Sequence, residues 1–198
     1  MQVYPRAVRR AKGPYVTEYA PRVRIGVLNA MTVKTTYLQM LSRSQRVVPS
    51  PREGLVVVHA KKPTVSYYRY LYDAVGREYD WTSRKKLSDA ELDSLLHDPR
   101  MEVHVLMADG VPAGFAELDR RKDGEIELVQ FGLLPEFIGH GLGRYFLQWT
   151  IDKAWSYNPR RFWLHTCNRD HKAALPNYLK AGFTVYKETV STGSNGNG

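Results

Sequence analysis

Gly139, Gly141 and Gly143 occupy alternate positions at the start of an expected helix, in the stretch LLPEFIGHGLGRYFLQW (residues 133–149). Glycine weakens a helix interior by about 1 kcal/mol relative to alanine, so three glycines at one helix start need a reason other than helix stability. Backbone N–H groups at a helix start point outward and favour an anion, and glycines let a phosphate lie against the backbone. The spacing therefore predicts a phosphate-binding turn.

Two common phosphate-binding motifs do not fit this turn. A P-loop requires Lys and then Ser or Thr after its last glycine, whereas Arg144 and Tyr145 follow Gly143. The dinucleotide pattern G-x-G-x-x-G fails because position 144 is arginine, and it expects successive βαβ units. What remains is a strand, a turn that contains Pro135, and G-x-G-x-G at a helix start, an arrangement that suits a pyrophosphate.

A second segment, AALPNYLKAGF (residues 173–183), follows the pattern A-x-x-x-Y-x-x-x-G-F. Together the two segments resemble the GNAT superfamily, the GCN5-related N-acetyltransferases, in its bacterial form. The acetyl-CoA pyrophosphate loop of that family has the motif Gln or Arg, two residues, Gly, one residue, and Gly or Ala; Ile138 stands here in the place of the Gln or Arg. The resemblance covers residues 55 to about 188 and implies an acetyltransferase with acetyl-CoA as co-substrate.

The resemblance also implies which residues hold acetyl-CoA. Arg144 lies in the first helical turn beside the glycines, where a guanidinium can pair with phosphate. The backbone N–H of Leu133 would contact the thioester oxygen, and Gly132 indicates either a strand bulge there or a close packing contact. The expected cofactor-binding residues are Leu133, Ile138, Gly139, His140, Gly141, Leu142, Gly143, Arg144 and His171.

Acyl transfer from a thioester to an amine requires a neutral amine, a polarised carbonyl and a proton for the leaving thiolate. By resemblance, Tyr178 is the expected proton donor to the thiolate, and Glu127, on the strand that leads to the glycine turn, is the expected base. Glu125 lies on the same face of that strand because side chains alternate. Two structural explanations stay open: Glu127 as a solvent-facing carboxylate, and Tyr178 as a tyrosine that covers its helix.

The acceptor site is expected where the chain is richest in tyrosine, because aromatic faces suit a cationic amine. Ordinary core packing explains the same composition. Asp73, Glu78 and Asp80 in this segment could attract a positive amine before it loses its proton. The aromatic residues of this segment are Tyr67, Tyr68, Tyr70, Tyr72, Tyr79 and Trp81.

No metal site is expected. No two of the six histidines have the H-x-x-x-H spacing of a zinc site, and Cys167 is the single cysteine. A cysteine at a strand end more often packs than acts as a nucleophile. We therefore expect a direct transfer from acetyl-CoA to a primary amine, without a covalent intermediate.

The elements that position these residues follow from periodicity and turn signals. Asp109-Gly110 between two alternating runs predicts a hairpin, and Ser88 with Glu91 forms a capping box. The predicted fold is α+β, a single GNAT-like domain with a central, mixed, mostly antiparallel twisted sheet flanked by about four helices. Expected strands are residues 33–41, 55–60 (buried), 101–108, 111–119, 126–134, 161–167 and 183–190, and expected helices 63–76, 88–98, 140–155 and 170–182.

The 198-residue chain is predicted to have one folded domain with two extensions. Residues 1–32 are expected to form a basic N-terminal arm, 33–54 an extra strand and linker, 55–190 the GNAT-like domain, and 191–198 a disordered tail. The extra strand would either add an edge to the sheet or pair with a second subunit, which leaves room for a homodimer.

The net charge of +9 favours anionic partners, but short basic pairs without interleaved aromatics argue against nucleic acid. The absence of an apolar run of eighteen residues and of a secretory signal argues against a membrane and for a cytoplasmic protein. Two other functions stay open: a non-catalytic CoA-binding GNAT-like module, and a basic nucleic-acid-associated protein. The amine acceptor, a small molecule or a protein, is not specified by the sequence.

Overall fold

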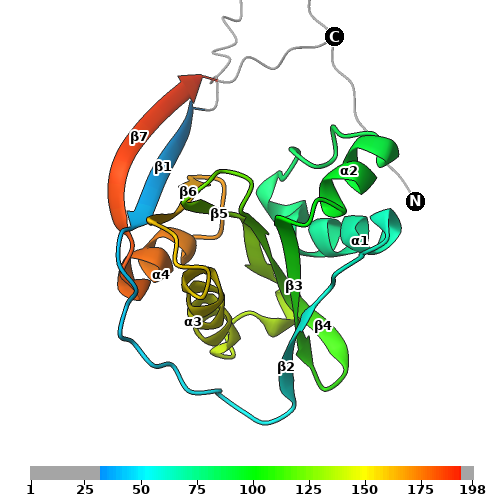
Figure 1. The fold of residues 1–198 in the computed structure, drawn as a ribbon, viewed down its shortest axis with the longest axis horizontal. Helices are drawn as coiled ribbons and strands as arrows, with labels where there is room; N and C mark the ends of the chain where they lie inside the picture. The colour runs from blue at the N-terminus through cyan, green and yellow to red at the C-terminus, as the bar shows by residue number, and fades with distance from the viewer. Residues whose placement is uncertain (1–31, 193–198) are drawn as a thin grey trace, which may run out of the picture.

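The computed structural model describes residues 32–192 and contains the predicted α+β fold (Figure 1). Most of the expected basic arm and of the expected tail lies outside the described residues. The strands are β1 (Thr32–Met40), β2 (Leu55–His59), β3 (Met101–Ala108), β4 (Val111–Asp119), β5 (Glu125–Leu133), β6 (Arg161–Cys167) and β7 (Thr184–Thr192). The helices are α1 (Val65–Gly76), α2 (Asp89–Leu96), α3 (Leu142–Trp155) and α4 (Ala174–Ala181), with short 3-10 turns at Arg77–Tyr79 and Pro135–Phe137.

The strands form one mixed sheet of seven in the order β2-β3-β4-β5-β6-β1-β7. All neighbouring pairs are antiparallel except β5 and β6, which are parallel because α3 carries the crossover between them. β1 is not at the edge: it pairs with β6 on one side and β7 on the other. The edge strands are β2 and β7. Val56 and Val58 of β2 are exposed, so the prediction of a buried strand at residues 55–60 was wrong in burial.

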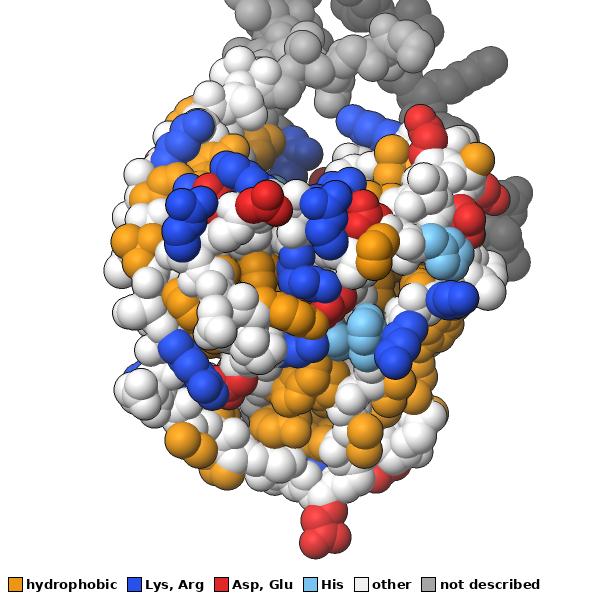
Figure 2. All heavy atoms as spheres, viewed as in Figure 1, with side chains coloured by type: hydrophobic (Ala, Val, Ile, Leu, Met, Phe, Trp, Pro, Cys, Tyr) orange, Lys and Arg blue, Asp and Glu red, His pale blue; other side chains and the backbone are white. Residues whose placement is uncertain are grey.

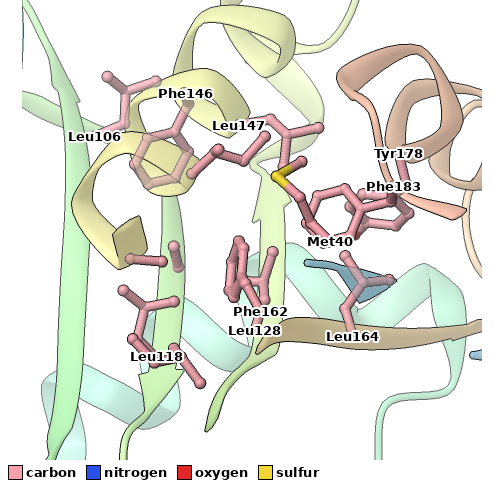
Figure 3. Packing of buried hydrophobic residues seen from close by; sticks show 14 of the residues in the cluster. Met40, Leu106, Leu118, Leu128, Phe146, Leu147, Phe162, Leu164, Tyr178 and Phe183 are labelled. Carbon is pink, nitrogen blue, oxygen red and sulfur yellow. The ribbon is translucent and has the colours of Figure 1, made fainter. Parts of the chain in front are cut away.

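Helices cover the two faces of the sheet, and a hydrophobic core fills each interface (Figure 1). The larger core joins α3 and α4 to residues from β1, β3, β4, β5 and β6, among them Met40, Leu128 and Phe162 (Figure 3). On the opposite face, α1 and α2 pack on β3 and β4 through residues such as Tyr68 and Phe115. Farther along this second face, side chains of β6 remain partly exposed.

Local sequence signals fix the positions of several elements. The hydroxyl of Ser88 accepts the N–H of Glu91 while the Glu91 carboxylate accepts the N–H of Ser88, so the predicted capping box is present at the start of α2. Asp109 and Gly110 have φ of 50° and 87°, as a two-residue hairpin turn requires. The periodic face of α1 is buried as predicted.

Charged side chains of both signs are interspersed on the face shown in Figure 2. Ion pairs in the structure include Arg43 with Asp152 (2.8 Å) and Arg52 with Asp109 (2.6 Å). Among residues 32–192, no helix is long and apolar enough to cross a membrane.

Candidate active site

The site is a cleft that opens where β5 and β6 separate. The two strands pair from Glu125 opposite Arg161 to Leu128 opposite Leu164, and their pairing ends there. Beyond this point lies a cavity of about 580 Å³. Its walls come from the ends of β5 and β6, the glycine turn, the start of α4 and the connection that follows α1.

A strand bulge contributes to this separation, but not at the predicted residue. Gln130 pairs with Glu117 and Leu128 with Leu118, so Val129 is the extra residue of β5. Gly132 serves packing instead, because a Cβ at this position would overlap Cγ1 of Val75. Of the two explanations for Gly132, the structure therefore favours the close packing contact.

Beyond the bulge, every second backbone N–H of β5 points into the cleft. The N–H of Leu134 donates to the carbonyl of Ala113 on β4 (2.9 Å). Backbone direction alternates along a strand, so the N–H of Leu133 points away from β4, toward the side where β6 no longer pairs. Leu133 also lines the cavity, so its N–H is available to a bound carbonyl.

The glycine turn has the backbone of an anion site. Gly139 and Gly141 have φ of 89° and 79°, which other residues rarely adopt, and a Cβ on Gly139 would meet no atom within 4 Å. Gly141 is the N-cap of α3 and offers no side-chain cap, which leaves N–H donors of the first turn without an internal partner. An anion placed here would accept hydrogen bonds at the positive end of the helix dipole.

The expected cofactor-binding residues divide into two groups. Leu133, Ile138, Gly139, Gly141, Gly143, Arg144 and His171 line the cleft. The side chain of Leu142 is buried in the core, so this residue can offer only its backbone, and the exposed side chain of His140 lies outside the cleft lining. Nδ1 of His171 accepts a hydrogen bond from the backbone N–H of Ala173 (3.1 Å).

Tyr178 is buried on α4 and lines the cleft (Figure 3). Its ring packs edge-on against Phe131 and Phe183. Burial, together with the nearby charge of Asp170, raises the pKa of the Tyr178 hydroxyl above its usual range. The phenol therefore stays protonated at neutral pH.

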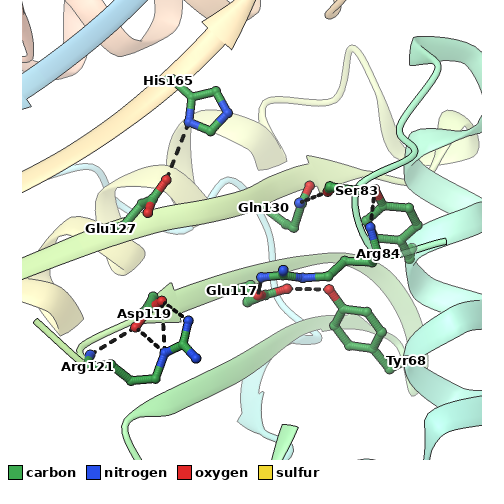
Figure 4. Close-up of polar contacts among 10 residues, drawn as sticks. Tyr68, Ser83, Arg84, Glu117, Asp119, Arg121, Glu127, Gln130 and His165 are labelled. Atoms are coloured by element: carbon green, nitrogen blue, oxygen red, sulfur yellow. Dashed lines mark hydrogen bonds and ion pairs between the residues drawn. The ribbon is translucent and has the colours of Figure 1, made fainter. Parts of the chain in front are cut away.

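Glu127 does not reach the cleft directly. Its Oε1 lies 3.4 Å from Nδ1 of His165 on the neighbouring strand (Figure 4), and it is His165 that lines the cavity. The sequence analysis missed His165 as a site residue. Alternation in the stretch RFWLHTC places His165 opposite the apolar positions, but no local signal shows that β5 and β6 separate beside it.

The predicted aromatic segment only partly lines the site. Tyr72, Tyr79 and Trp81 line the cleft, as does Asp80. Tyr68 is in the core instead, and Tyr70 is exposed. The other two predicted carboxylates, Asp73 and Glu78, are absent from the cleft lining.

A buried polar network holds this segment against the sheet (Figure 4). Arg84 forms a salt bridge with Glu117 on β4, and the hydroxyl of Tyr68 donates to the same carboxylate. Glu117 is fully buried, so this network fixes the connection between α1 and α2. In the same segment, the indole N–H of Trp81 donates a hydrogen bond to Asp170 across the cleft (3.3 Å).

Among the described residues, one group of three potential metal ligands exists: His59, Glu102 and His104. Sequence spacing did not reveal it, because His59 comes from the neighbouring strand. The Glu102 carboxylate already accepts hydrogen bonds from His104 (2.9 Å) and Tyr157 (2.6 Å) and pairs with Arg120 (3.0 Å). Ion pairing within the protein therefore accounts for the group.

The fold and this cleft define an acetyltransferase-like α+β protein, and the comparisons with known proteins agree. A family model described as "Acetyltransferase (GNAT) family" matches residues 68–183, more than half of the chain. The chain belongs to the GNAT acetyltransferase family, as the sequence resemblance indicated.

Relatives in sequence are themselves without an assigned substrate. The chain is 31% identical over 99 residues to uncharacterized N-acetyltransferases of Mycobacterium tuberculosis and Mycobacterium bovis. The match covers 50% of this chain and 63% of those proteins, so it spans less than two thirds of their length.

Solved structures share the fold at low sequence identity. A GCN5-related N-acetyltransferase from Sphaerobacter thermophilus superimposes with a TM-score of 0.59 at 17% identity, over 80% of this chain and 50% of that one. A functionally unknown protein from Staphylococcus epidermidis gives 0.57 at 20% identity, over 80% and 60%. An aminoglycoside acetyltransferase from a soil metagenome gives 0.55 at 11% identity, over 67% and 90%.

Proposed function

We propose that this protein transfers the acetyl group of acetyl-CoA directly to a primary amine. The observation that carries the proposal is the convergence of three features on one cleft: the glycine turn at the start of α3, the free edge of β5 and the tyrosine of α4. Each matches one requirement of the reaction: binding an anionic cofactor, polarising a carbonyl and assisting a thiolate.

The residues present fit acetyl-CoA. The N–H donors of the first turn of α3 suit a pyrophosphate, and Arg144 adds a positive charge beside them. The free edge of β5, residues 129–133, offers backbone groups to the amide-bearing arm of CoA. His171 donates from Nε2 when it is neutral, because its Nδ1 already accepts a hydrogen bond. Ile138 contributes no side-chain hydrogen bond, so backbone contacts dominate at the turn.

At the reacting end, the N–H of Leu133 donates to the thioester oxygen as negative charge develops on it. The Tyr178 hydroxyl donates a hydrogen bond to the leaving sulfur. Its raised pKa makes complete proton loss unfavourable, so Tyr178 acts mainly as a hydrogen-bond donor. Glu127, the expected base, does not line the cleft, so it can act on the amine only through a neighbouring group.

The amine enters from the side of α1, where Tyr72, Tyr79 and Trp81 form an aromatic wall with Asp80 beside it. An aromatic wall stabilises a cation by about 0.5–2 kcal/mol, and a carboxylate attracts it further. This wall favours a primary amine that arrives protonated.

The test compares two glycine variants in an assay of thiol release from acetyl-CoA with a panel of primary amines. Gly141→Ala places a side chain at φ of 79° and should raise the KM for acetyl-CoA about 10-fold or more, because a left-handed residue costs about 1–2 kcal/mol and displaces the first-turn donors. Gly110→Ala is the matched control: it has a similar left-handed backbone (φ of 87°) with no atom within 4 Å of its Cβ, and it lies outside the cleft lining, so the KM should not change. Absence of amine-dependent release from the unmodified protein would contradict the proposal.

A further inference from the structure

His165 stands at the point where the cleft begins. The last paired residues of β5 and β6 are Leu128 and Leu164, so His165 is the first residue of β6 beyond the paired segment. Phe162 and Leu164 are buried in the core under α3, and alternation turns His165 to the opposite face, from which the amine enters. The imidazole thus lies at the apex of the cleft and is 46% exposed there.

The contacts of this ring favour one tautomer. Nδ1 lies 3.4 Å from Oε1 of Glu127, a carboxylate with 22% side-chain exposure that can accept but not donate at neutral pH. Among residues 32–192, no hydrogen-bond partner contacts Nε2 of His165. A carboxylate beside Nδ1 favours the tautomer with the proton on that nitrogen, in which the lone pair of Nε2 is free. The ring of Tyr37, at a centroid distance of 5.7 Å, packs beside the imidazole, and Lys187 lies over the tyrosine ring at 5.2 Å.

Other groups that line the cleft are less suited to accept a proton. Asp170 accepts hydrogen bonds from the hydroxyl of Thr166 (2.7 Å), the N–H of Cys167 (2.8 Å) and the indole of Trp81. His171 uses Nδ1 as an acceptor, so its Nε2 carries the proton when the ring is neutral. Asp80 belongs to the aromatic wall that follows α1, and not to β5 or β6.

We propose that His165 is the catalytic residue that accepts the amine proton at Nε2, and that Glu127 is a positioning residue that holds its ring. This inference rests on the proposed acetyl transfer. The protonated amine first loses one proton to solvent. The neutral nitrogen then forms the bond to the acetyl carbon, the carbon–sulfur bond breaks, and CoA leaves as a thiolate. The second proton lost from nitrogen moves to Nε2 of His165, and the imidazolium is stabilised by the Glu127 carboxylate. The thiolate accepts a hydrogen bond from Tyr178 and is protonated from solvent.

The kinetic test uses His165→Ala with the panel amine that gives the fastest thiol release. We expect kcat to fall about 100-fold or more, with acetyl-CoA binding by calorimetry unchanged. Added imidazole should restore part of the lost rate in His165→Ala and leave the unmodified protein unaffected. Glu127→Gln should lower kcat by a smaller factor and should not respond to imidazole. His97→Ala, at an exposed histidine outside the cleft, is the matched control and should retain full activity.

A second measurement needs no acceptor. Nitrogen chemical shifts of the histidine side chains in the free protein should show neutral His165 protonated on Nδ1, and Glu127→Gln should remove this preference. His165 protonated on Nε2 in the unmodified protein would overturn the proposal, even if His165→Ala fails to fold.

The outcomes separate this inference from the proposed function. An active unmodified protein whose His165→Ala variant keeps more than half of its kcat would overturn the role of His165 alone. Loss of activity in Asp80→Asn or Glu127→Gln with an unaffected His165→Ala would do the same and would assign the base elsewhere. No amine-dependent thiol release from the unmodified protein would overturn both.

Discussion

Tyr178 shows how the surroundings of one side chain limit its chemistry. An exposed phenol has a pKa of about 10, already above that of a thiol at about 8.5, so proton transfer from tyrosine to a thiolate is uphill. Burial on α4 and the charge of Asp170 raise the pKa of Tyr178 further. The favourable contribution of Tyr178 is therefore a hydrogen bond that strengthens as negative charge grows on sulfur.

We predict that Tyr178→Phe lowers kcat about 10-fold and leaves the KM for acetyl-CoA nearly unchanged, because one transition-state hydrogen bond to a charged atom is lost. Since the folded-state pKa of Tyr178 lies above its usual value, the hydroxyl stays protonated as pH rises through 9. The rate ratio of unmodified protein to Tyr178→Phe should therefore stay constant between pH 7 and 9. A ratio that falls to unity over this interval, measured by initial rates, would contradict the assignment.

Glu102 illustrates a carboxylate used for stability. Burial by itself would raise the pKa of Glu102, but hydrogen bonds from His104 and Tyr157 and the charges of Lys153 and Arg120 outweigh it and lower the pKa to about 2. A group with a depressed folded-state pKa stabilises the fold above its unfolded pKa, here 4.5, and this stabilisation is lost as pH falls from 4.5 through 2.

We predict that Glu102→Gln lowers the free energy of unfolding by about 3 kcal/mol at pH 7, from a pKa difference of about 2.5. About half of this difference should remain at pH 3. Urea denaturation at both pH values measures it, with exposed Glu53→Gln as the control that should change stability by less than about 0.5 kcal/mol. An equal deficit at pH 7 and pH 3 would show that lost packing, not charge, causes it.

Residue types and spacing predicted the glycine turn, because it depends on local backbone, and the family resemblance pointed to Tyr178. They did not predict His165 or the Arg84–Glu117 pair. His165 becomes a cleft residue only because parallel pairing stops at Leu164, and Arg84 meets Glu117 across 33 residues of chain. Both depend on tertiary contacts that a single sequence does not display.

At the scale of elements, β1 is an integral strand of the sheet although it precedes the rest of the domain in the sequence. It pairs with both β6 and β7 and buries Leu38 and Met40 in the core. It also brings Tyr37 beside His165. Because β1 lies outside residues 68–183, the match to the family model does not include a strand that supports the site.

We predict that Leu38→Ala lowers the free energy of unfolding by about 2–5 kcal/mol, since Leu38 is fully buried and the substitution leaves a cavity. Leu41→Ala, one residue beyond β1 and 63% exposed, is the matched control and should cost less than about 0.5 kcal/mol. Urea denaturation of the two variants measures the difference. Similar small losses in both would indicate that β1 is not an integral strand of the sheet in solution.

Most elements could be predicted because their signals are local. Each signal is formed by residues that are close together in the sequence. This holds for the capping box of α2, the turn at Asp109-Gly110 and the apolar face of α1. The position of β1 inside the sheet depends on which strands it pairs with, and alternation fixes only its face. The sequence therefore left two alternatives open for this strand: an edge strand of the sheet, or a strand that pairs with a second subunit.

At the scale of the whole molecule, the cleft is bordered by two separate parts of the chain. The glycine turn and α4 border one part of it, and the aromatic wall after α1 borders another. Direct transfer requires acetyl-CoA and amine to be bound together, with no acetyl group held by the protein between them. Cys167 is the one nucleophilic thiol of the chain, and it lines the cleft.

We predict that initial rates with both substrates varied give intersecting lines, as a ternary complex requires. Cys167→Ser should retain most of the activity, because no step of direct transfer uses the thiol. Mass spectrometry of the protein incubated with acetyl-CoA alone should find no acetyl group on Cys167. Parallel lines together with an acetylated Cys167 would establish a covalent route instead.

The central claim is that the cleft between β5 and β6 holds acetyl-CoA through the glycine turn. Thermal unfolding with and without excess acetyl-CoA tests it most directly. At about one hundred times its dissociation constant, a ligand stabilises the fold by about 2.7 kcal/mol, a shift of roughly 5–10 °C for a domain of this size. We predict that acetyl-CoA and CoA produce this shift, that ATP does not, and that Gly141→Ala abolishes it. No shift with either CoA compound, or an equal shift with ATP, would contradict the account.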